Sequence, residues 1–594
     1  MSDSSDFTLT ADSLRALIDE AEAEAEARDT GAPIDGNSSE PPQPPDDDGP
    51  PEGEPSRYPP PSREVIQACA KLDQNDTDNG SRLLAHFGEE FLNVREVGLH
   101  AWCGTHWDPD GGPEAVERFA QETARRIKLE GPEIDPSDGD RRKIAAAEPL
   151  KGMPQADLTE EEKGILKLGL EAEERLAKRR SDRRKFAVSC GNRARTMAMI
   201  AQALPHCTVS PAEMDANPML FNLTNGTLAF ERRTVEEDDP ECPDPDVRRT
   251  VKRLKVGVRL LPHDRQHRIA KIAPVAYDPN ARCRRFFRFI RRFLPDRSQR
   301  KFVQTAIGRA LVGGASTQVL IFFYGDGANG KSVLMEVFAE LLGAYAGRLK
   351  PESISGVMEG RGDQATPDFA RLKGKRFVAI AELPRGAPLR EGLVKTMTGG
   401  EPMPVRHLNK GFFDLEPEFI PFMSGNDLPE VGGLDHGIWR RLKFVHFPVK
   451  IPDAEQRPLK EVVGEFLEEG PGILNWIIEG ALRFLRDGLK EPPAVAALTA
   501  AHREDLDPVG AFVGACVRQK EGARVQARLM YEAFESFCLA NAIRPWKETA
   551  FGRALKKKGF HREDKRIRQW LDVELYDVPA RPEPRSPHSS LDDY

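Results

Sequence analysis

A glycine-rich segment between two apolar runs limits the fold of this chain more than any other feature. The sequence GDGANGKS follows the apolar run TQVLIFFY and precedes the amphipathic run VLMEVFAELL. In that setting the spacing GxxxxGKS predicts a strand, a tight loop and a helix. Glycines let backbone N–H groups turn toward a phosphate, and the N-terminus of the helix adds positive potential. The sequence therefore predicts a phosphate-binding loop at the edge of a sheet.

The loop supplies the first candidate site residues. The predicted nucleotide-binding residues are Gly325, Asp326, Gly327, Ala328, Asn329, Gly330, Lys331 and Ser332. We expect Lys331 to reach the β- and γ-phosphates of ATP, and Ser332 to ligate Mg2+.

Three later positions extend this site. Glu382 ends the apolar strand KRFVAIA and is expected to hold Mg2+ or to orient the attacking water, although a solvent-facing acid at a strand end is the alternative. Asn426 ends the strand FIPFMSG, where an amide can position water beside the γ-phosphate. Arg440 and Arg441 precede another apolar strand, and adjacent arginines there suit a finger inserted into a neighbour's ATP site. A surface salt bridge is the alternative for this pair.

Alternation of short apolar strands with helices predicts an α/β fold with a mostly parallel sheet and helices on both faces.

The sequence also predicts a division into seven segments. They are a disordered acidic, Pro-rich tail (1–62), an N-terminal α+β region (63–205), a region preceding the ATPase (206–300), the ATPase core (301–450), further helices (451–507), a C-terminal domain (508–577) and a flexible tail (578–594). A short acidic helix is expected within 9–28, a hairpin near 95–112, and a strand–turn–strand at 218–230. Residues 508–575 predict three helices and a strand pair.

Charge is divided unevenly along the chain. The net charge is −9, yet residues 1–60 carry 16 acidic and 3 basic side chains, so the remainder is slightly basic. Basic stretches at 281–301 and 511–570 can bind nucleic acid, with a solvated helix face as the alternative.

There is no run of 18 apolar residues and no secretory signal pattern, so we expect no membrane contact. Eight scattered cysteines without a CxxC pair predict reduced, buried thiols in the cytoplasm.

Taken in order, these motifs resemble those of the superfamily 3 helicases, and more narrowly the phage and plasmid primase–helicases related to poxvirus ATPases. GANGKS, KTMTGGEPMPVR, SGNDLP and WRRL carry the resemblance, with FNLTNGTLAF and VAYDPNARC upstream and ILNWIIEGALRFLRDGL downstream. It covers about 70 to 490 and extends more faintly into the C-terminal domain.

Membership of that family implies an AAA+-like P-loop ATPase core that works as a homo-oligomer, usually a hexameric ring, on single-stranded or forked DNA with 3′-to-5′ polarity. It also implies a DNA-gripping hairpin, here PVRHLNKGFF with His407 and Lys410 near its tip. Partners would include other replication proteins, in a bacterial cytoplasm if the gene belongs to a phage or plasmid. The C-terminal domain resembles a winged helix in which Lys556, Lys557 and Lys558 would touch DNA phosphates.

Two departures from the family pattern keep alternatives open. Ala381 stands where many relatives have a second acid, so Glu382 is expected to serve both as a metal ligand and as the base. Residues 63–205 show no paired-Asp and His constellation, so primer synthesis is not expected, although a bifunctional primase–helicase is an alternative. A further alternative is a nucleotide-switched protein that binds origin DNA or loads a helicase without unwinding. A small-molecule P-loop kinase fits the paired arginines and basic patches poorly.

Overall fold

The structure, a computed structural model, describes residues 9–10, 58–238, 250–314, 317–356, 367–383, 387–406, 411–431, 436–564 and 567–580. The chain divides into two compact units. The N-terminal unit comprises Glu26–Ala229 and Arg259–Tyr277, and the C-terminal unit comprises Met1–Ala25, Phe230–Val258 and Asp278–Tyr594.

The N-terminal unit packs helices against a small sheet. Its helices are α2 (Arg63–Ala70), α3 (Asp76–Phe87), α4 (Gly112–Arg126), α5 (Asp138–Ala147), α6 (Glu160–Cys190) and α7 (Arg193–Ala203). Its sheet has the order β4 (Trp107–Asp108), β3 (Gly98–Trp102), β2 (Phe91–Val94) and β5 (Thr208–Val209). The hairpin predicted near 95–112 is confirmed as the antiparallel pair β3–β4. Polar side chains cap some of these helices: Ser62 caps α2, and a capping box of Thr159 and Glu162 starts α6.

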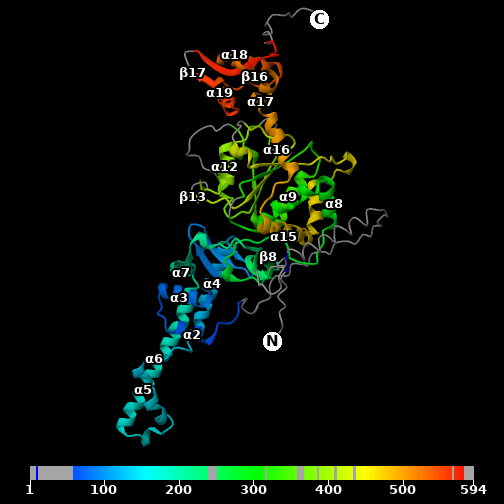
Figure 1. The fold of residues 1–594 in the computed structure, drawn as a ribbon. Coiled ribbons are helices and arrows are strands. Elements are labelled where there is room, and N and C mark those ends of the chain that lie inside the picture. Colours follow the sequence, from blue (N-terminus) through cyan, green and yellow to red (C-terminus); the bar gives the residue numbers. More distant parts are fainter. Residues whose placement is uncertain are drawn as a thin grey trace, which may run out of the picture. The chain divides into compact units, whose positions relative to one another are not determined.

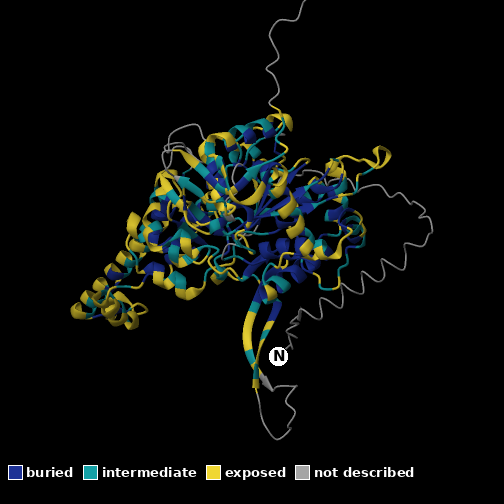
Figure 2. Cartoon of the chain, turned by 45° about the horizontal axis from the view of Figure 1, so that its top comes forward, coloured by how far each residue is buried: buried dark blue, intermediate teal, exposed yellow. Residues whose placement is uncertain are grey.

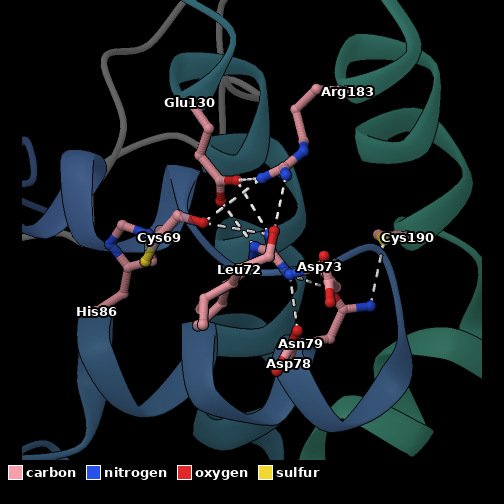
Figure 3. Close-up of polar contacts among 10 residues, drawn as sticks. Cys69, Leu72, Asp73, Asp78, Asn79, His86, Glu130, Arg183 and Cys190 are labelled. Carbon is pink, nitrogen blue, oxygen red and sulfur yellow. Dashed lines mark hydrogen bonds and ion pairs between the residues drawn. The ribbon is translucent and has the colours of Figure 1, made fainter. Parts of the chain in front are cut away.

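A buried charge network joins the helices of this unit (Figure 3). The Arg82 guanidinium donates to Glu130 at 2.8 Å and to the carbonyl oxygens of Leu72 and Asp73 at 3.0 and 2.8 Å. Arg183, on α6, pairs with the same carboxylate and donates to the Leu72 carbonyl at 2.7 Å. Arg82 and Glu130 are at most 1% exposed. The two arginines therefore hold α6 against the turn that follows α2.

Helices α5 and α6 lie side by side as a projecting pair (Figure 1). They pack tightly at Gly169, where an added Cβ would lie 2.1 Å from the Ala147 Cβ. Most residues of α5 and of the first half of α6 are exposed or half-buried (Figure 2), so this pair adds surface rather than core.

A four-stranded sheet has the order β1-β8-β7-β6. Its strands are β1 (Leu9–Thr10), β6 (Leu220–Leu223), β7 (Gly226–Asp238) and β8 (Thr250–Leu261). The predicted strand–turn–strand is confirmed as β6–β7. Leu9 and Thr10, at the start of the helix predicted within 9–28, form a strand instead, because Leu9 pairs with Val258 in β8; the rest of that range lies outside the described residues. Backbone pairing along an open strand edge is a tertiary contact that local composition does not predict.

Most of the predicted N-terminal tail lies outside the described residues. The folded part begins at least as early as Tyr58, because its ring lies 5.3 Å from Phe87 and 5.4 Å from Phe119, centroid to centroid. Folded packing thus starts before the predicted boundary at residue 62.

A parallel five-stranded sheet forms the centre of the C-terminal unit. Its order is β10 (Ala346–Leu349), β11 (Phe377–Ile380), β14 (Ile420–Gly425), β9 (Leu320–Tyr324) and β15 (Leu442–His446). All four pairings are parallel, which confirms the mixed α/β class and the parallel sheet. The central strands β9 and β14 are buried almost throughout, as expected for strands covered on both faces.

Helices surround this sheet in the chain order α8 (Arg284–Phe293), α9 (Arg297–Gly308), α10 (Lys331–Leu342), α11 (Pro367–Ala370), α12 (Glu391–Gly399), α13 (His436–Trp439), α14 (Leu459–Leu467), α15 (Gly470–Asp487) and α16 (Pro493–Asp505). Helices α9 and α15 cross at two glycines. A Cβ at Gly308 would lie 2.2 Å from the Ala481 nitrogen, and one at Gly480 would lie 1.9 Å from the Gln304 carbonyl oxygen. The hairpin β12 (Met403–Arg406) and β13 (Phe412–Leu415) precedes β14.

The last folded part has its own apolar core, built around Phe512, Phe534, Phe551 and Trp570. Its elements follow the order α17 (Pro508–Cys516), β16 (Val517–Gln526), α18 (Ala527–Ala540), α19 (Glu548–Lys557), β17 (Arg562–Asp564) and β18 (Arg568–Leu575). The three predicted helices are confirmed, but the predicted strand pair is a three-stranded sheet of order β16-β18-β17. The missed strand, β16, is mostly exposed and charged, so it lacks the alternation that marks a half-buried strand.

The predictions of buried cysteines and of no membrane span can also be compared with the described residues. Six of the seven described cysteines are buried as predicted, whereas Cys103 is exposed in the turn between β3 and β4. Within the described ranges, no helix combines the length and apolar character that crossing a membrane requires.

Candidate nucleotide site

The loop of residues 325–330 joins β9 to α10 and takes a backbone path that needs glycine. Gly325, Gly327 and Gly330 have φ angles of 150°, 76° and 79°. A Cβ at Gly325 would lie 2.5 Å from the Phe447 carbonyl oxygen, and one at Gly330 would lie 2.9 Å from the Phe289 ring. Such left-handed conformations strain other residues, so the loop's shape depends on these glycines.

Lys331 is the first residue of α10 and is only 4% exposed. Its Nζ donates to the Gly325 carbonyl oxygen at 2.7 Å, to Asn329 Oδ1 at 2.8 Å and to Asn426 Oδ1 at 3.3 Å. Burial lowers the pKa of Lys331, while the negative charges of Glu382 and Asp326 act to raise it. Because its partners are neutral oxygens, a charged phosphate oxygen would be a stronger acceptor.

The structure brings the other strand-end residues to the same edge of the sheet. Asn426 directly follows β14, and its amide oxygen contacts Lys331. Glu382 lies two residues beyond β11 with an exposed side chain. Glu382, Asn426, Lys331 and Ser332 line one cavity. A carboxylate and a hydroxyl facing that cavity are oxygen ligands of the kind that Mg2+ takes, so the residues present fit the expected metal.

The cavity beside the loop has a volume of about 600 Å³. Its apolar wall, which packs against the loop at Gly330, comes from Phe289 and Phe293 of α8 and from Leu459, Val462 and Phe466 of α14. The sequence prediction missed this wall. The apolar periodicity of 286–294 indicated a helix with one buried face, and no local pattern shows that α8 packs beside the loop.

Ion pairs at the surface link the segments of this wall. Arg292 of α8 lies 2.6 Å from Glu455, and Arg285 lies 2.7 Å from Glu468. The Glu469 carboxylate also accepts the backbone N–H groups of Arg285 and Phe286, each at 3.0 Å, and so caps the start of α8. An apolar cavity with a charged rim next to the phosphate loop has room for the base and ribose of a nucleotide.

An aromatic pair stands at the entrance to the loop. The rings of Tyr324 and His446, at the ends of β9 and β15, stack with centroids 4.5 Å apart. Burial lowers the pKa of His446, and burial together with the charge of Asp326 raises the pKa of Tyr324. Both rings are therefore neutral near pH 7.

The structure distinguishes the two candidate finger arginines. Arg441 is 9% exposed, and its guanidinium donates to the Gly437 carbonyl oxygen at 2.6 Å. Arg440 is exposed, and its guanidinium lies 3.2 Å from the Gln318 side-chain oxygen. Only Arg440 presents its charged group to the solvent.

The structure describes three of the five residues that were predicted to contact DNA. His407 and Lys410 lie outside the described residues, between β12 and β13. Lys556 and Lys557 are exposed at the end of α19, whereas the Lys558 amine lies 2.5 Å from the Asp507 carboxylate. That ion pair makes Lys558 a weaker candidate for a phosphate contact than a lysine with a free amine would be.

Two family models match this chain. The model described as "D5 N terminal like" matches residues 80–295, and the one described as "Poxvirus D5 protein-like" matches residues 504–575. The two matched ranges flank the predicted ATPase core.

Curated relatives come from large DNA viruses. "Putative helicase L207/L206" of Acanthamoeba polyphaga mimivirus is 30% identical over 38% of this chain and 25% of its own length. "Putative helicase 022R" of Frog virus 3 is 26% identical over 43% and 28% of the two chains, and "Putative primase C962R" of African swine fever virus is 22% identical over 50% and 31%. The chain thus spans between a quarter and a third of the length of these relatives.

Among solved structures, the C-terminal region of NrS-1 is similar to 48% of this chain and 73% of its own, with 11% identity and a TM-score of 0.32. A likeness of that size does not define the fold, which is described above from the chain's own strands and helices.

Proposed function

We propose that this chain, which matches the two D5 family models and resembles viral proteins named putative helicases and primases, is a superfamily 3 primase–helicase and acts as an ATP-dependent DNA helicase of a replication module. ATP would bind between the subunits of a hexameric ring, and its hydrolysis would drive translocation on single-stranded or forked DNA. The relatives are viral and do not support a bacterial host. The proposal therefore keeps the cytoplasmic location expected from the sequence and does not include a bacterial host.

One observation supports this function above the others: Lys331, Ser332, Glu382 and Asn426 come from three separate chain segments and line one cavity beside a glycine loop. Lys331 and the loop N–H groups would bind the phosphates. Ser332 and Glu382 would hold Mg2+, which would neutralise charge on the phosphates when bound. Glu382 would orient and deprotonate the attacking water, and Asn426 would hold that water beside the γ-phosphate.

The exposed position of Arg440 supports its assignment as the finger. A finger acts on the site of a neighbouring subunit, so its guanidinium must be able to leave its own surface. Arg441, held against the Gly437 carbonyl, would instead fix the start of β15.

The element order of the C-terminal domain supports the proposal of an AAA+-type motor followed by a winged helix. Helix, strand, two helices and a two-stranded wing follow one another in α17–β16–α18–α19–β17–β18. In that arrangement α19, with Lys556 and Lys557, would contact DNA phosphates.

Displacement of a labelled strand from a forked duplex tests this function, with Glu382→Gln as the diagnostic variant. The change keeps the size of the side chain and removes the base, so we expect ATP binding to persist while displacement and hydrolysis fall by about 100-fold or more. Unwinding by the glutamine variant at the wild-type rate would contradict the assignment of Glu382.

Primase–helicase activity is a second candidate, because a relative that matches half of this chain is named a primase. Incorporation of labelled NTPs into primers on single-stranded DNA would test it. Primers made equally by the wild-type protein and by Lys331→Ala would place that activity outside the ATPase site.

A further inference from the structure

Arg288 is an exposed arginine in the middle of a crowded positive face of α8. The residues three and four positions before and after it on this helix are all arginines, namely Arg284, Arg285, Arg291 and Arg292. Residues at these spacings are neighbours on a helix surface, where like charges destabilise the helix. Arg288 therefore costs helix stability, and a bound anion would remove that cost.

The other arginines that line the nucleotide cavity already have carboxylate partners. Arg285 and Arg292 form the ion pairs with the 453–469 segment described above. Arg457, on the same rim, lies 2.6 Å from Glu465. Arg288 also lines the cavity, and among the residues that the structure describes it has no carboxylate within ion-pair distance. Its positive charge is thus available to a ligand of this cavity.

The residue next to Arg288 shows which part of a nucleotide is nearby. Phe289 packs against the phosphate loop, because a Cβ at Gly330 would lie 2.9 Å from its ring. The same ring lies 5.0 Å from Phe466 in the apolar wall, centroid to centroid. The helical turn that carries Arg288 is therefore where the loop and the apolar wall meet. In a nucleotide, the α-phosphate likewise joins the β-phosphate, which the loop would bind, to the ribose and base.

We propose that Arg288 binds the α-phosphate of the nucleotide. This inference rests on the proposed nucleotide site and adds a residue to it. A guanidinium presents a planar fork of N–H donors that fits two phosphate oxygens, and hydrogen bonds between opposite charges are among the strong ones. Because ADP keeps the α-phosphate, Arg288 would hold the nucleotide both before and after hydrolysis.

The test measures binding of ADP and of a non-hydrolysable ATP analogue, each with Mg2+, to the full-length chain by calorimetry. Arg288→Gln removes the charge, and Arg288→Lys keeps the charge without the fork. We expect Arg288→Gln to bind both nucleotides about tenfold more weakly than the wild type, and Arg288→Lys to recover part of that loss. In hydrolysis assays the KM of Arg288→Gln for ATP should rise about tenfold with little change in kcat.

Arg297→Gln is the matched control. Arg297 is an exposed arginine on α9 that does not line the cavity, so its variant should bind both nucleotides like the wild type. Thermal unfolding of each variant shows that the fold is kept.

Three results would overturn the assignment of Arg288: an unchanged affinity of Arg288→Gln for both nucleotides, a loss confined to the ATP analogue, or a loss of single-stranded DNA binding in its place. The second would assign the cation to the γ-phosphate, and the third to the DNA backbone. Failure of the proposed nucleotide site is a different result, in which the wild-type protein itself binds neither nucleotide.

Discussion

At the scale of single residues, the buried carboxylate of Glu130 has the largest predicted effect on stability. It faces two buried guanidiniums, and its removal leaves both without the carboxylate that they share. We expect Glu130→Ala to lower the free energy of unfolding of the N-terminal unit by about 3–5 kcal/mol. Glu133→Ala, which breaks the surface pair with Arg63, should cost less than about 1 kcal/mol. Hydrogen exchange of the α2 and α3 amides in the full chain measures both, and equal protection in the two variants would contradict the role of Glu130.

His86 predicts a pH dependence for the same unit. Burial, and then the nearby charge of Arg126, lower the pKa of His86 from 6.5 to about 4. The unfolded state therefore binds more protons than the folded state between pH 4 and 6.5, so stability contributed by neutral His86 is lost as the pH falls through that window. The full loss is roughly 3 kcal/mol. Protection of the α3 amides should fall over this range in the wild type and less steeply in His86→Gln; parallel profiles would contradict the assignment.

At the scale of elements, the crossing of α9 and α15 depends on the lack of side chains at two positions. A methyl group at Gly480 would meet the Gln304 carbonyl, so Gly480→Ala must push the helices apart. We expect a loss of about 2–4 kcal/mol. Gly464→Ala, in α14 with open space around it, should be neutral or slightly stabilising because alanine favours a helix. Thermal unfolding of both variants checks this, and an unchanged melting temperature for Gly480→Ala would show that the helices can move without cost.

The elements that the sequence predicted are those with strong local patterns. The continuous apolar runs of β9, β11 and β14 and the periodicity of α8 and α15 indicated their types correctly. Those it missed depend on partners distant in sequence. Strand β16 is charged and exposed, and β1 is a strand only because Leu9 pairs with Val258. Both are strands because their backbones pair with distant strands, and the pattern of their own side chains does not show that pairing.

At the scale of the whole molecule, the proposed ring predicts that active sites are shared between subunits. A mixture of Lys331→Ala and Arg440→Ala subunits forms some interfaces that join an intact phosphate loop to an intact finger. Random assembly would place the two together at about a quarter of the interfaces, so we expect hydrolysis near a quarter of the wild-type rate although each variant alone is inactive. Arg441→Ala, the control at the buried position, should perturb stability instead. No rescue in the mixture would place Arg440 outside the neighbour's site.

Only part of the candidate site could be predicted from the sequence, because some of its residues are placed by local spacing and others by packing between distant segments. The phosphate loop and the strand ends follow from local spacing, because parallel strands place their carboxyl ends at one edge. The apolar wall of the cavity joins Phe289 and Phe466, which lie on either side of the loop in sequence and meet only in the folded chain. Which arginine faces solvent likewise depends on the path of α13 into β15, and not on the dipeptide itself.

The proposed nucleotide site and motor are tested by ATP hydrolysis with and without single-stranded DNA, measured for the wild-type protein and for Lys331→Ala. We expect DNA to stimulate hydrolysis by the wild type, and the variant to lose about 100-fold or more of its activity. Hydrolysis by Lys331→Ala at the wild-type rate would contradict the nucleotide site. Wild-type hydrolysis that DNA leaves unchanged would contradict the DNA-driven motor.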